Sequence, residues 1–131
     1  IGGIAAAIKL QRPHVRIVGV ETVGCPTLTN ALAAGKPVVL PEINTKVPIL
    51  GARKTEMINY ELVRDYVDEI VLVDEDSPLE MARWMWKNTG LAVELGAATV
   101  VSAVMNEFTN IGKSERVVAV LCGSGDDGLP K

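Results

Sequence analysis

The stretch YELVRDYVDEIVLVDEDSPLE, residues 60–80, holds the end of a helix, a strand and the start of a second helix. Apolar and charged side chains recur at helical spacing over residues 56–67, and the apolar run 69–73 predicts a strand. Ser77 and Glu80 have the spacing of a capping box, so the next helix is predicted to begin there and to end at Gly90. A strand between two helices needs crossover connections, which favours parallel pairing and an α/β fold.

The same alternation continues on both sides of this stretch. Residues 36–55 are rich in proline and predict an irregular segment with room for one short strand. The other predicted elements are helix 1–10, strand 15–21, helix 26–34 closed by Gly35, a short extended entry followed by a helix within 91–108, and strand 115–121. We therefore expect one α/β domain over residues 1–131, with a three-layer αβα arrangement around an open, mostly parallel sheet.

Composition excludes several classes of protein. The net charge is −3 and no basic cluster occurs, so nucleic acid is not an expected partner. No apolar run reaches the ~20 residues of a membrane span, and no stretch of the sequence has the pattern of a secretory signal, so neither a membrane nor a secreted protein is expected. Cys25 and Cys122 are the only cysteines and His14 the only histidine, which indicates reduced thiols, a cytoplasmic location and no zinc site.

The loop CGSGDD, residues 122–127, comes directly after the last predicted strand. Ligands of open α/β sheets bind at the carboxyl ends of strands, and Cys122 and Ser124 offer a thiol and a hydroxyl there. The phosphate-binding fingerprints need a helix after the glycine loop, and Asp126 and Asp127 would repel an anion. The loop is therefore interpreted as a hydrogen-bond donor to a ring nitrogen, and a simple turn at the end of a strand is the alternative.

Five segments in order resemble the C-terminal part of fold type II pyridoxal-phosphate (PLP) enzymes, the group of threonine and serine dehydratases, threonine synthases and cysteine synthases. The resemblance covers essentially the whole chain. The segments are IGGIAAAIKLQRPHVRIVGVE (1–21), NALAAGKPV (30–38), YELVRDYVDEIVLVDED (60–76), GLAVELGAATVVSAV (90–104) and VVAVLCGSGDD (117–127). The expectation that PLP is the cofactor rests on this resemblance.

The resemblance implies a set of cofactor-binding residues. The position that contacts the pyridine nitrogen falls on Cys122 in one alignment and on Ser124 in another, and we favour Ser124 because a hydroxyl is the stronger donor. Gly123 belongs to the same glycine-rich bend. Glu94 matches a carboxylate near the cofactor, although a glutamate at a helix start also favours the helix dipole. Gly96 matches a small residue that lets the backbone approach the ring.

Other parts of the family site are not matched. No lysine of the chain lies in the family's SxKxR-type motif, so no catalytic residue is expected here, and the Schiff-base lysine and the phosphate loop are expected upstream. The chain is accordingly expected to be a fragment of a longer polypeptide. Glu21 matches the first acid of a divalent-metal site found in some dehydratases, but Thr27 occupies the second position, so no metal is expected.

The implied function is the C-terminal portion of a PLP-dependent lyase that catalyses β-elimination, with dehydration and deamination of a small hydroxy amino acid such as threonine or serine. A β-replacement enzyme of the threonine synthase or cysteine synthase type is one alternative. A non-catalytic metabolite-binding α/β module is another. The expected partners are an amino-acid substrate and either the missing N-terminal segment or a second copy, since a half-site would expose apolar surface.

Overall fold

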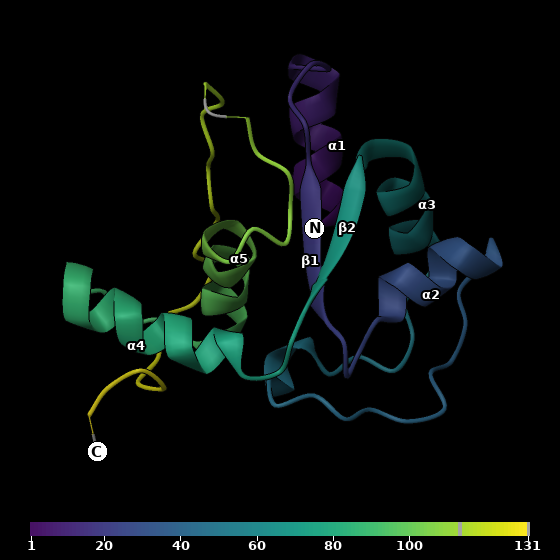
Figure 1. Cartoon of the computed structure of the whole chain (residues 1–131). Coiled ribbons are helices and arrows are strands. Elements are labelled where there is room, and N and C mark those ends of the chain that lie inside the picture. Colours follow the sequence, from purple (N-terminus) through teal and green to yellow (C-terminus); the bar gives the residue numbers. More distant parts are fainter. Residues whose placement is uncertain (113, 131) are drawn as a thin grey trace.

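The fold is described by a computed structural model that covers residues 1–112 and 114–130. Lys113 and Lys131, two of the lysines without the family motif, lie outside the described residues. The elements are α1 Gly2–Gln11, β1 Val18–Thr22, α2 Thr27–Ala34, the 3-10 turn η1 Pro48–Leu50, α3 Met57–Tyr66, β2 Glu69–Val73, α4 Ser77–Thr89 and α5 Leu95–Met105 (Figure 1). The predicted order of helices and of the first two strands is confirmed, whereas residues 36–55 contain η1 and no strand.

The sheet consists of β1 and β2, which pair in parallel from Val18 opposite Glu69 to Thr22 opposite Val73. One face carries Val18 and Val20 with the buried valines of β2, and this face packs against Ala103 of α5. Side chains alternate across a strand, so Gly19 belongs to the opposite face. A Cβ atom at Gly19 would lie 2.8 Å from Cδ1 of Ile1, which places the start of α1 against that face.

Helix α1 also packs on α3, because a Cβ atom at Gly2 would lie 3.0 Å from Cβ of Leu62. The sheet is thus covered by α1 with α3 on one face and by α5 on the other (Figure 1). The chain is an α/β protein with a small parallel sheet between helical layers. Among the described residues, no helix combines the length and apolar character that a membrane crossing requires.

Glycine closes two of the helices as the sequence predicts. Helix α2 ends at Gly35 with φ 69°, and α4 ends at Gly90 with φ 72°. These left-handed conformations are strained for residues that carry a Cβ atom. Both helix ends are therefore confirmed, and the next segments start in the directions that these turns impose.

The predicted capping box of α4 is wrong. The Asp74 carboxylate accepts hydrogen bonds from the backbone N–H groups of Asp76, at 2.9 Å, and Ser77, at 2.8 Å. Ser77 is already helical, and its buried hydroxyl forms no hydrogen bond with the described residues. An aspartate placed two or three residues before the N–H groups reaches them through its own turn, and here it displaces serine from the capping role.

The predicted third strand is also absent from the described residues. Residues 115–121 form no ladder, and Val118 is 87% exposed. In Figure 1 this part of the chain, after α5, runs apart from β1 and β2. A β-branched run becomes a strand only when a neighbouring strand accepts its hydrogen bonds, and no described strand lies beside this one.

A second core lies between α4 and α5. Met81, Ala82 and Met85 of α4 pack against Ala97 and Ala98 of α5. Both methionines are buried, whereas Trp84 on the neighbouring face remains 42% exposed. Alanines on α5 allow the two helices to approach closely, which fixes the position of the chain that enters α5.

Candidate functional site

The entry to α5 pairs with the C-terminal loop. Val93 and Ser124 form an antiparallel bridge. The Glu94 N–H group donates to the Gly123 carbonyl at 3.3 Å, and the Gly125 N–H group donates to the Ala92 carbonyl at 3.4 Å. The structure thereby brings Glu94 next to Gly123 and Ser124, which are remote in sequence.

The Asp127 carboxylate strengthens this junction at the helix start. Its Oδ2 atom accepts a hydrogen bond from the Leu95 N–H group at 3.1 Å. Leu95 is the first residue of α5, so this carboxylate supplies an acceptor that the first turn of a helix lacks. From the sequence, Asp127 was interpreted only as a charge that repels anions, and this contact was missed.

Glycine is required where the loop crosses Glu94. A Cβ atom at Gly123 would collide with the Glu94 carboxylate, and one at Gly125 would lie 2.9 Å from the Glu94 Cα atom. A Cβ atom at Gly96 would lie 3.7 Å from Glu94 Oε1 and 2.6 Å from Cγ2 of Ile49 in η1. Glu94 therefore lies between the loop and the start of α5, and Gly96 lies against η1.

A small pocket opens on the other side of the loop. Its volume is about 250 Å³, and its lining residues are Leu91, Ala92, Val93, Leu121, Cys122, Gly123 and Ser124. Side chains alternate along extended chain, so Cys122 and Ser124 point away from the face that contacts Glu94. Of the five predicted site residues, Cys122, Gly123 and Ser124 line this pocket, whereas Glu94 and Gly96 do not.

Glu21, which matches a metal ligand of some dehydratases, caps α2 instead. Its carboxylate accepts hydrogen bonds from the Leu28 N–H group at 2.7 Å, and from the N–H group and hydroxyl of Thr29, both at 2.9 Å. The Thr27 hydroxyl donates to the Ala52 carbonyl. Within residues 1–112 and 114–130, no group of three histidines, cysteines or acids is arranged for a metal ion.

Glu75 lies just after β2, at the carboxyl end of the strand, and its hydrogen-bond partners are remote in sequence. Its carboxylate accepts hydrogen bonds from the N–H groups of Gly24, at 2.7 Å, and Lys46, at 2.6 Å, and from the Thr45 hydroxyl at 2.9 Å. Burial alone would raise the pKa of Glu75, but these hydrogen bonds outweigh it and lower the pKa. The charged carboxylate thus joins the β1–α2 turn to the loop before η1.

Comparison with known proteins identifies the family of this chain. A family model described as "Pyridoxal-phosphate dependent enzyme" matches residues 1–123. The chain belongs to this family. The PLP family resemblance inferred from the sequence is therefore confirmed, and PLP is the cofactor that the family implies for the complete enzyme.

Several curated relatives match almost the whole chain. An L-threonine ammonia-lyase of Geobacter sulfurreducens is 36% identical over 97% of the chain, which covers 31% of that protein. A phenylserine dehydratase of Ralstonia pickettii is 30% identical over 97% of the chain, which covers 39% of that protein. The chain thus spans about a third of the length of these curated relatives.

Solved structures show the same fold. The processed form of threonine deaminase isoform 2 from Solanum lycopersicum superimposes with a TM-score of 0.86 at 25% identity, over 95% of this chain and 36% of that one. Maize serine racemase gives a TM-score of 0.76 at 29% identity, over 82% of this chain and 33% of that one. The α/β arrangement of helices around β1 and β2 is therefore part of the PLP enzyme fold.

The residues of the 250 Å³ pocket fit one end of PLP. Ser124 and Cys122 supply a hydroxyl and a thiol, and Leu91 and Val93 supply apolar walls, as an aromatic ring with one ring nitrogen requires. No lysine, arginine or histidine is among the lining residues, so this pocket offers no cation to a phosphate group. Its volume is also below the ~300–1,000 Å³ of typical complete ligand sites.

Proposed function

We propose that this chain is the C-terminal portion of a PLP-dependent lyase that eliminates the β-hydroxyl group of a small hydroxy amino acid. The observation that carries the proposal is the pairing of Val93 with Ser124, which fixes a hydroxyl-bearing pocket at the C-terminal loop. Relatives named L-threonine ammonia-lyase and phenylserine dehydratase support this choice of reaction. Threonine, serine or a similar amino acid is the proposed substrate.

In this proposal the chain holds the pyridine end of the cofactor. When bound, PLP supplies an electron sink for the substrate. The Ser124 hydroxyl donates a hydrogen bond to the ring nitrogen and orients the ring, and Cys122 is the alternative donor. Gly123 keeps the loop free of a side chain where it passes Glu94, Gly96 in the first turn of α5 allows η1 to approach, and the Glu94 carboxylate supports the loop from its other face.

The remaining parts of the proposed site come from outside this chain. The lysine that binds the cofactor and moves the α-proton, and the loop that binds the phosphate, are both assigned to preceding sequence of the complete enzyme. The exposed valines of residues 117–121 are proposed to be covered by that part of the enzyme or by a second copy. We also propose a cytoplasmic location, in line with the free thiols of Cys25 and Cys122.

A serine racemase is the second candidate. A rice serine racemase is 30% identical to this chain over 97% of its length, and the maize enzyme shares its fold. The β-replacement alternative has weaker support, since O-ureido-L-serine synthase superimposes with a TM-score of 0.74 at only 19% identity, which shows the fold alone. When the complete enzyme is given L-threonine or L-serine, release of a 2-oxo acid identifies elimination, whereas accumulation of the D-amino acid identifies racemisation.

The role of Ser124 is tested in the protein expressed from its complete reading frame. Ser124→Ala removes one hydrogen bond to the ring, so we expect kcat to fall about tenfold and the absorption spectrum of the bound cofactor to shift. Ser114→Ala, at an exposed serine outside the pocket, is the matched control. Cys122→Ala is measured in parallel. If Cys122→Ala alone lowers kcat, Cys122 is the nitrogen donor, and if neither variant has an effect, this pocket does not hold the cofactor.

A further inference from the structure

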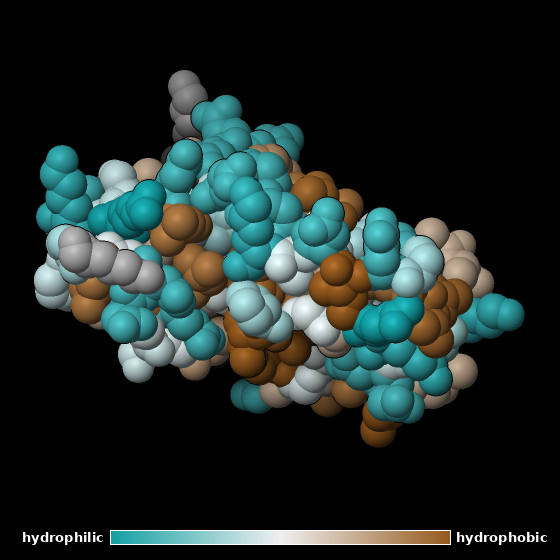
Figure 2. Space-filling view, turned by 90° about the horizontal axis from the view of Figure 1, so that it is seen from below, coloured by the Kyte–Doolittle hydropathy of each residue, from teal (hydrophilic) through white to brown (hydrophobic). Residues whose placement is uncertain are grey.

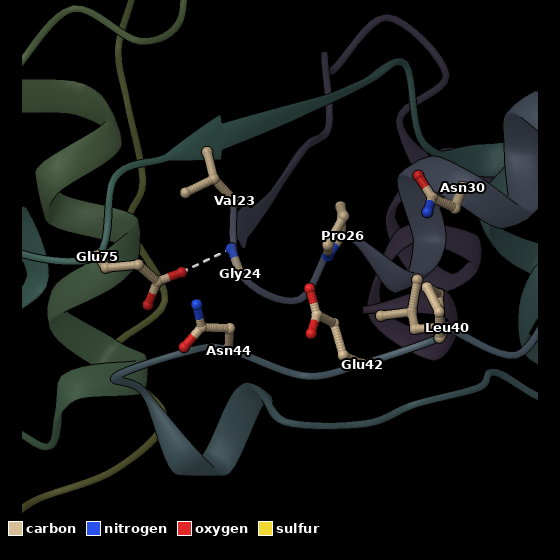
Figure 3. Close-up of a pocket in the computed structure, with 9 residues that line it drawn as sticks. Val23, Gly24, Pro26, Asn30, Leu40, Glu42, Asn44 and Glu75 are labelled. Atoms are coloured by element: carbon tan, nitrogen blue, oxygen red, sulfur yellow. Dashed lines mark hydrogen bonds between the residues drawn. The ribbon is translucent and has the colours of Figure 1, made fainter.

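A larger cleft lies at the carboxyl ends of the strands, separate from the pocket of the C-terminal loop. Its volume is about 360 Å³, and it shares no lining residue with the 250 Å³ pocket. It lies between the β1–α2 turn and the chain from 40 to 44 (Figure 3). Its lining residues are Val23, Gly24, Pro26, Asn30, Leu40, Pro41, Glu42, Asn44 and Glu75.

Hydrogen bonds between backbone groups and fixed side chains hold the two walls of this cleft in place. The Asn44 N–H group donates to the Gly24 carbonyl at 2.9 Å, and the Gly24 N–H group donates to the Glu75 carboxylate at 2.7 Å. The Arg53 guanidinium donates to the carbonyls of Leu40 at 2.9 Å and Pro41 at 2.8 Å. The cleft is therefore formed before any ligand arrives, which lowers the entropic cost of binding.

The polar groups of the cleft favour a cation. In Figure 3 the Glu42 carboxylate points toward the β1–α2 turn, and the Asn44 amide points toward Gly24. Glu42, Asn44 and Asn30 have side chains that form no hydrogen bond with the described residues. No lysine, arginine or histidine lines the cleft, and the nearby Lys46 ammonium is paired with the Asp76 carboxylate at 2.6 Å. The Arg53 guanidinium beside the cleft is engaged by the Leu40 and Pro41 carbonyls, so the charged side chains that an anion would meet in the lining are the carboxylates of Glu42 and Glu75.

The apolar groups of the cleft favour an organic ligand over a metal ion. Val23, Pro26, Leu40 and Pro41 line the walls, and the volume greatly exceeds that of one ion. Glu75 already accepts three hydrogen bonds, which leaves Glu42 as the one lining carboxylate without a protein partner among the described residues. A ligand with an ammonium group for Glu42 and a short aliphatic chain for the walls matches both features.

We propose that this cleft binds a small primary ammonium compound that carries a short aliphatic chain. Glu42 provides the charge contact, and Val23, Pro26 and Leu40 contact the chain. The site is distinct from the proposed cofactor pocket, so its occupancy does not depend on PLP.

The proposal is tested with butylammonium as the probe. The full 131-residue chain, labelled with ¹⁵N, is titrated with butylammonium, with 1-butanol as the neutral analogue and with butyrate as the anionic one. We expect amide shifts at Gly24, Asn30 and Asn44. The affinity for butylammonium should be about 1.5-fold to fivefold higher than for 1-butanol, as expected for exposed ion pairs, and it should fall as salt is added.

Glu42→Gln should make the affinities for butylammonium and 1-butanol equal. The control Glu61→Gln, at an exposed residue of α3, should leave the preference for butylammonium unchanged. Glu42 is exposed and forms no hydrogen bond, so this variant retains its fold, as circular dichroism will verify. Equal affinities in the unchanged chain, a preference that survives Glu42→Gln, or shifts confined to other residues would overturn the proposal. Displacement of butylammonium by micromolar Ca²⁺ would instead establish a metal site and would also overturn it.

Discussion

At the scale of single residues, carboxylates organise the carboxyl edge of the sheet. Glu21 accepts hydrogen bonds from the start of α2, and Asp74 accepts them from the start of α4. Glu75 joins two loops through the N–H groups of Gly24 and Lys46. Each carboxylate satisfies backbone donors that would otherwise lack partners, and hydrogen bonds to a charged acceptor are about twice as strong as neutral ones.

Glu75 should make the stability of the chain depend on pH. Its pKa is lower in the folded chain than in the unfolded one, so its stabilising contribution is fully present above the ordinary glutamate range and is lost as pH falls through the folded pKa. Glu75→Gln should therefore lower the free energy of unfolding at pH 7, and the difference from the unchanged chain should shrink from about pH 4 downward. Urea unfolding between pH 7 and pH 3 measures this.

Glu61→Gln, at an exposed position of α3 where the side chain forms no hydrogen bond, is the control for this series. The free energy of unfolding of Glu61→Gln should stay close to that of the unchanged chain at every pH. If Glu75→Gln changes the free energy of unfolding by the same amount at pH 7 and at pH 3, the charge of Glu75 contributes nothing to stability.

Sequence patterns located residues with a local or family signature and missed those with distant partners. Ser124, Gly123 and Glu94 were selected from motifs, and the structure places them side by side. The role of Glu75 was missed because its partners, Gly24 and Thr45, lie far away in the sequence and have no pattern that links them to it. Glu94 and Ser124 lie on opposite faces of the loop because Val93 pairs with Ser124, and local sequence does not specify this pairing.

At the scale of elements, the start of α4 shows how two local signals compete. Ser77 with Glu80 and Asp74 with Ser77 are both plausible capping arrangements in sequence. In the structure, Asp74 caps the start of α4. The hydrogen bond from the Ser77 N–H group is the main cause of the lowered pKa of Asp74. The Ser77 hydroxyl is left buried without a hydrogen-bond partner among the described residues.

This difference predicts opposite outcomes for two alanine variants. Asp74→Ala removes the acceptor of two N–H groups and should lower the free energy of unfolding by about 0.5–2 kcal/mol. Ser77→Ala removes a buried hydroxyl that lacks a partner, so stability should stay the same or rise slightly. Urea denaturation at neutral pH compares the two, and a larger loss for Ser77→Ala than for Asp74→Ala would show that serine is the cap.

Helices and strands differ in how far sequence alone determines them. The ends of α2 and α4 were predicted because Gly35 and Gly90 supply a conformation that local sequence dictates. Residues 115–121 have the composition of a strand but form none, since strand formation depends on a partner that local sequence does not specify. The same dependence explains why β2 was located correctly, as β1 pairs with its full length.

At the scale of the whole molecule, the chain exposes many apolar side chains for its size. Val118 is 87% exposed, and Val117 and Val120 beside it are exposed by nearly half. Figure 2 shows further apolar residues between polar ones on the face seen from below the view of Figure 1. Contiguous exposed apolar residues are typical of surfaces that another chain or segment covers.

We expect this surface to drive self-association of the isolated 131-residue chain. Val118→Ser should reduce the average mass measured by light scattering at a given concentration, because it removes the most exposed apolar side chain of the 117–121 segment. Ile58→Ser, at a position on α3 that is 71% exposed, is the matched control and should leave the average mass unchanged. A monomeric unchanged chain, or an equal effect of both variants, would contradict the assignment of this surface.

We propose that this chain forms the pyridine-nitrogen end of a PLP site whose lysine belongs to preceding sequence. This assignment is tested by the visible absorption spectra of two proteins, the product of the complete reading frame and the 131-residue chain, each mixed with PLP and then dialysed. We predict a retained visible band of lysine-bound cofactor in the complete product and none in the 131-residue chain. A complete product that retains no band, or a 131-residue chain that retains one by itself, would show that the cofactor is not shared between this chain and preceding sequence in this way.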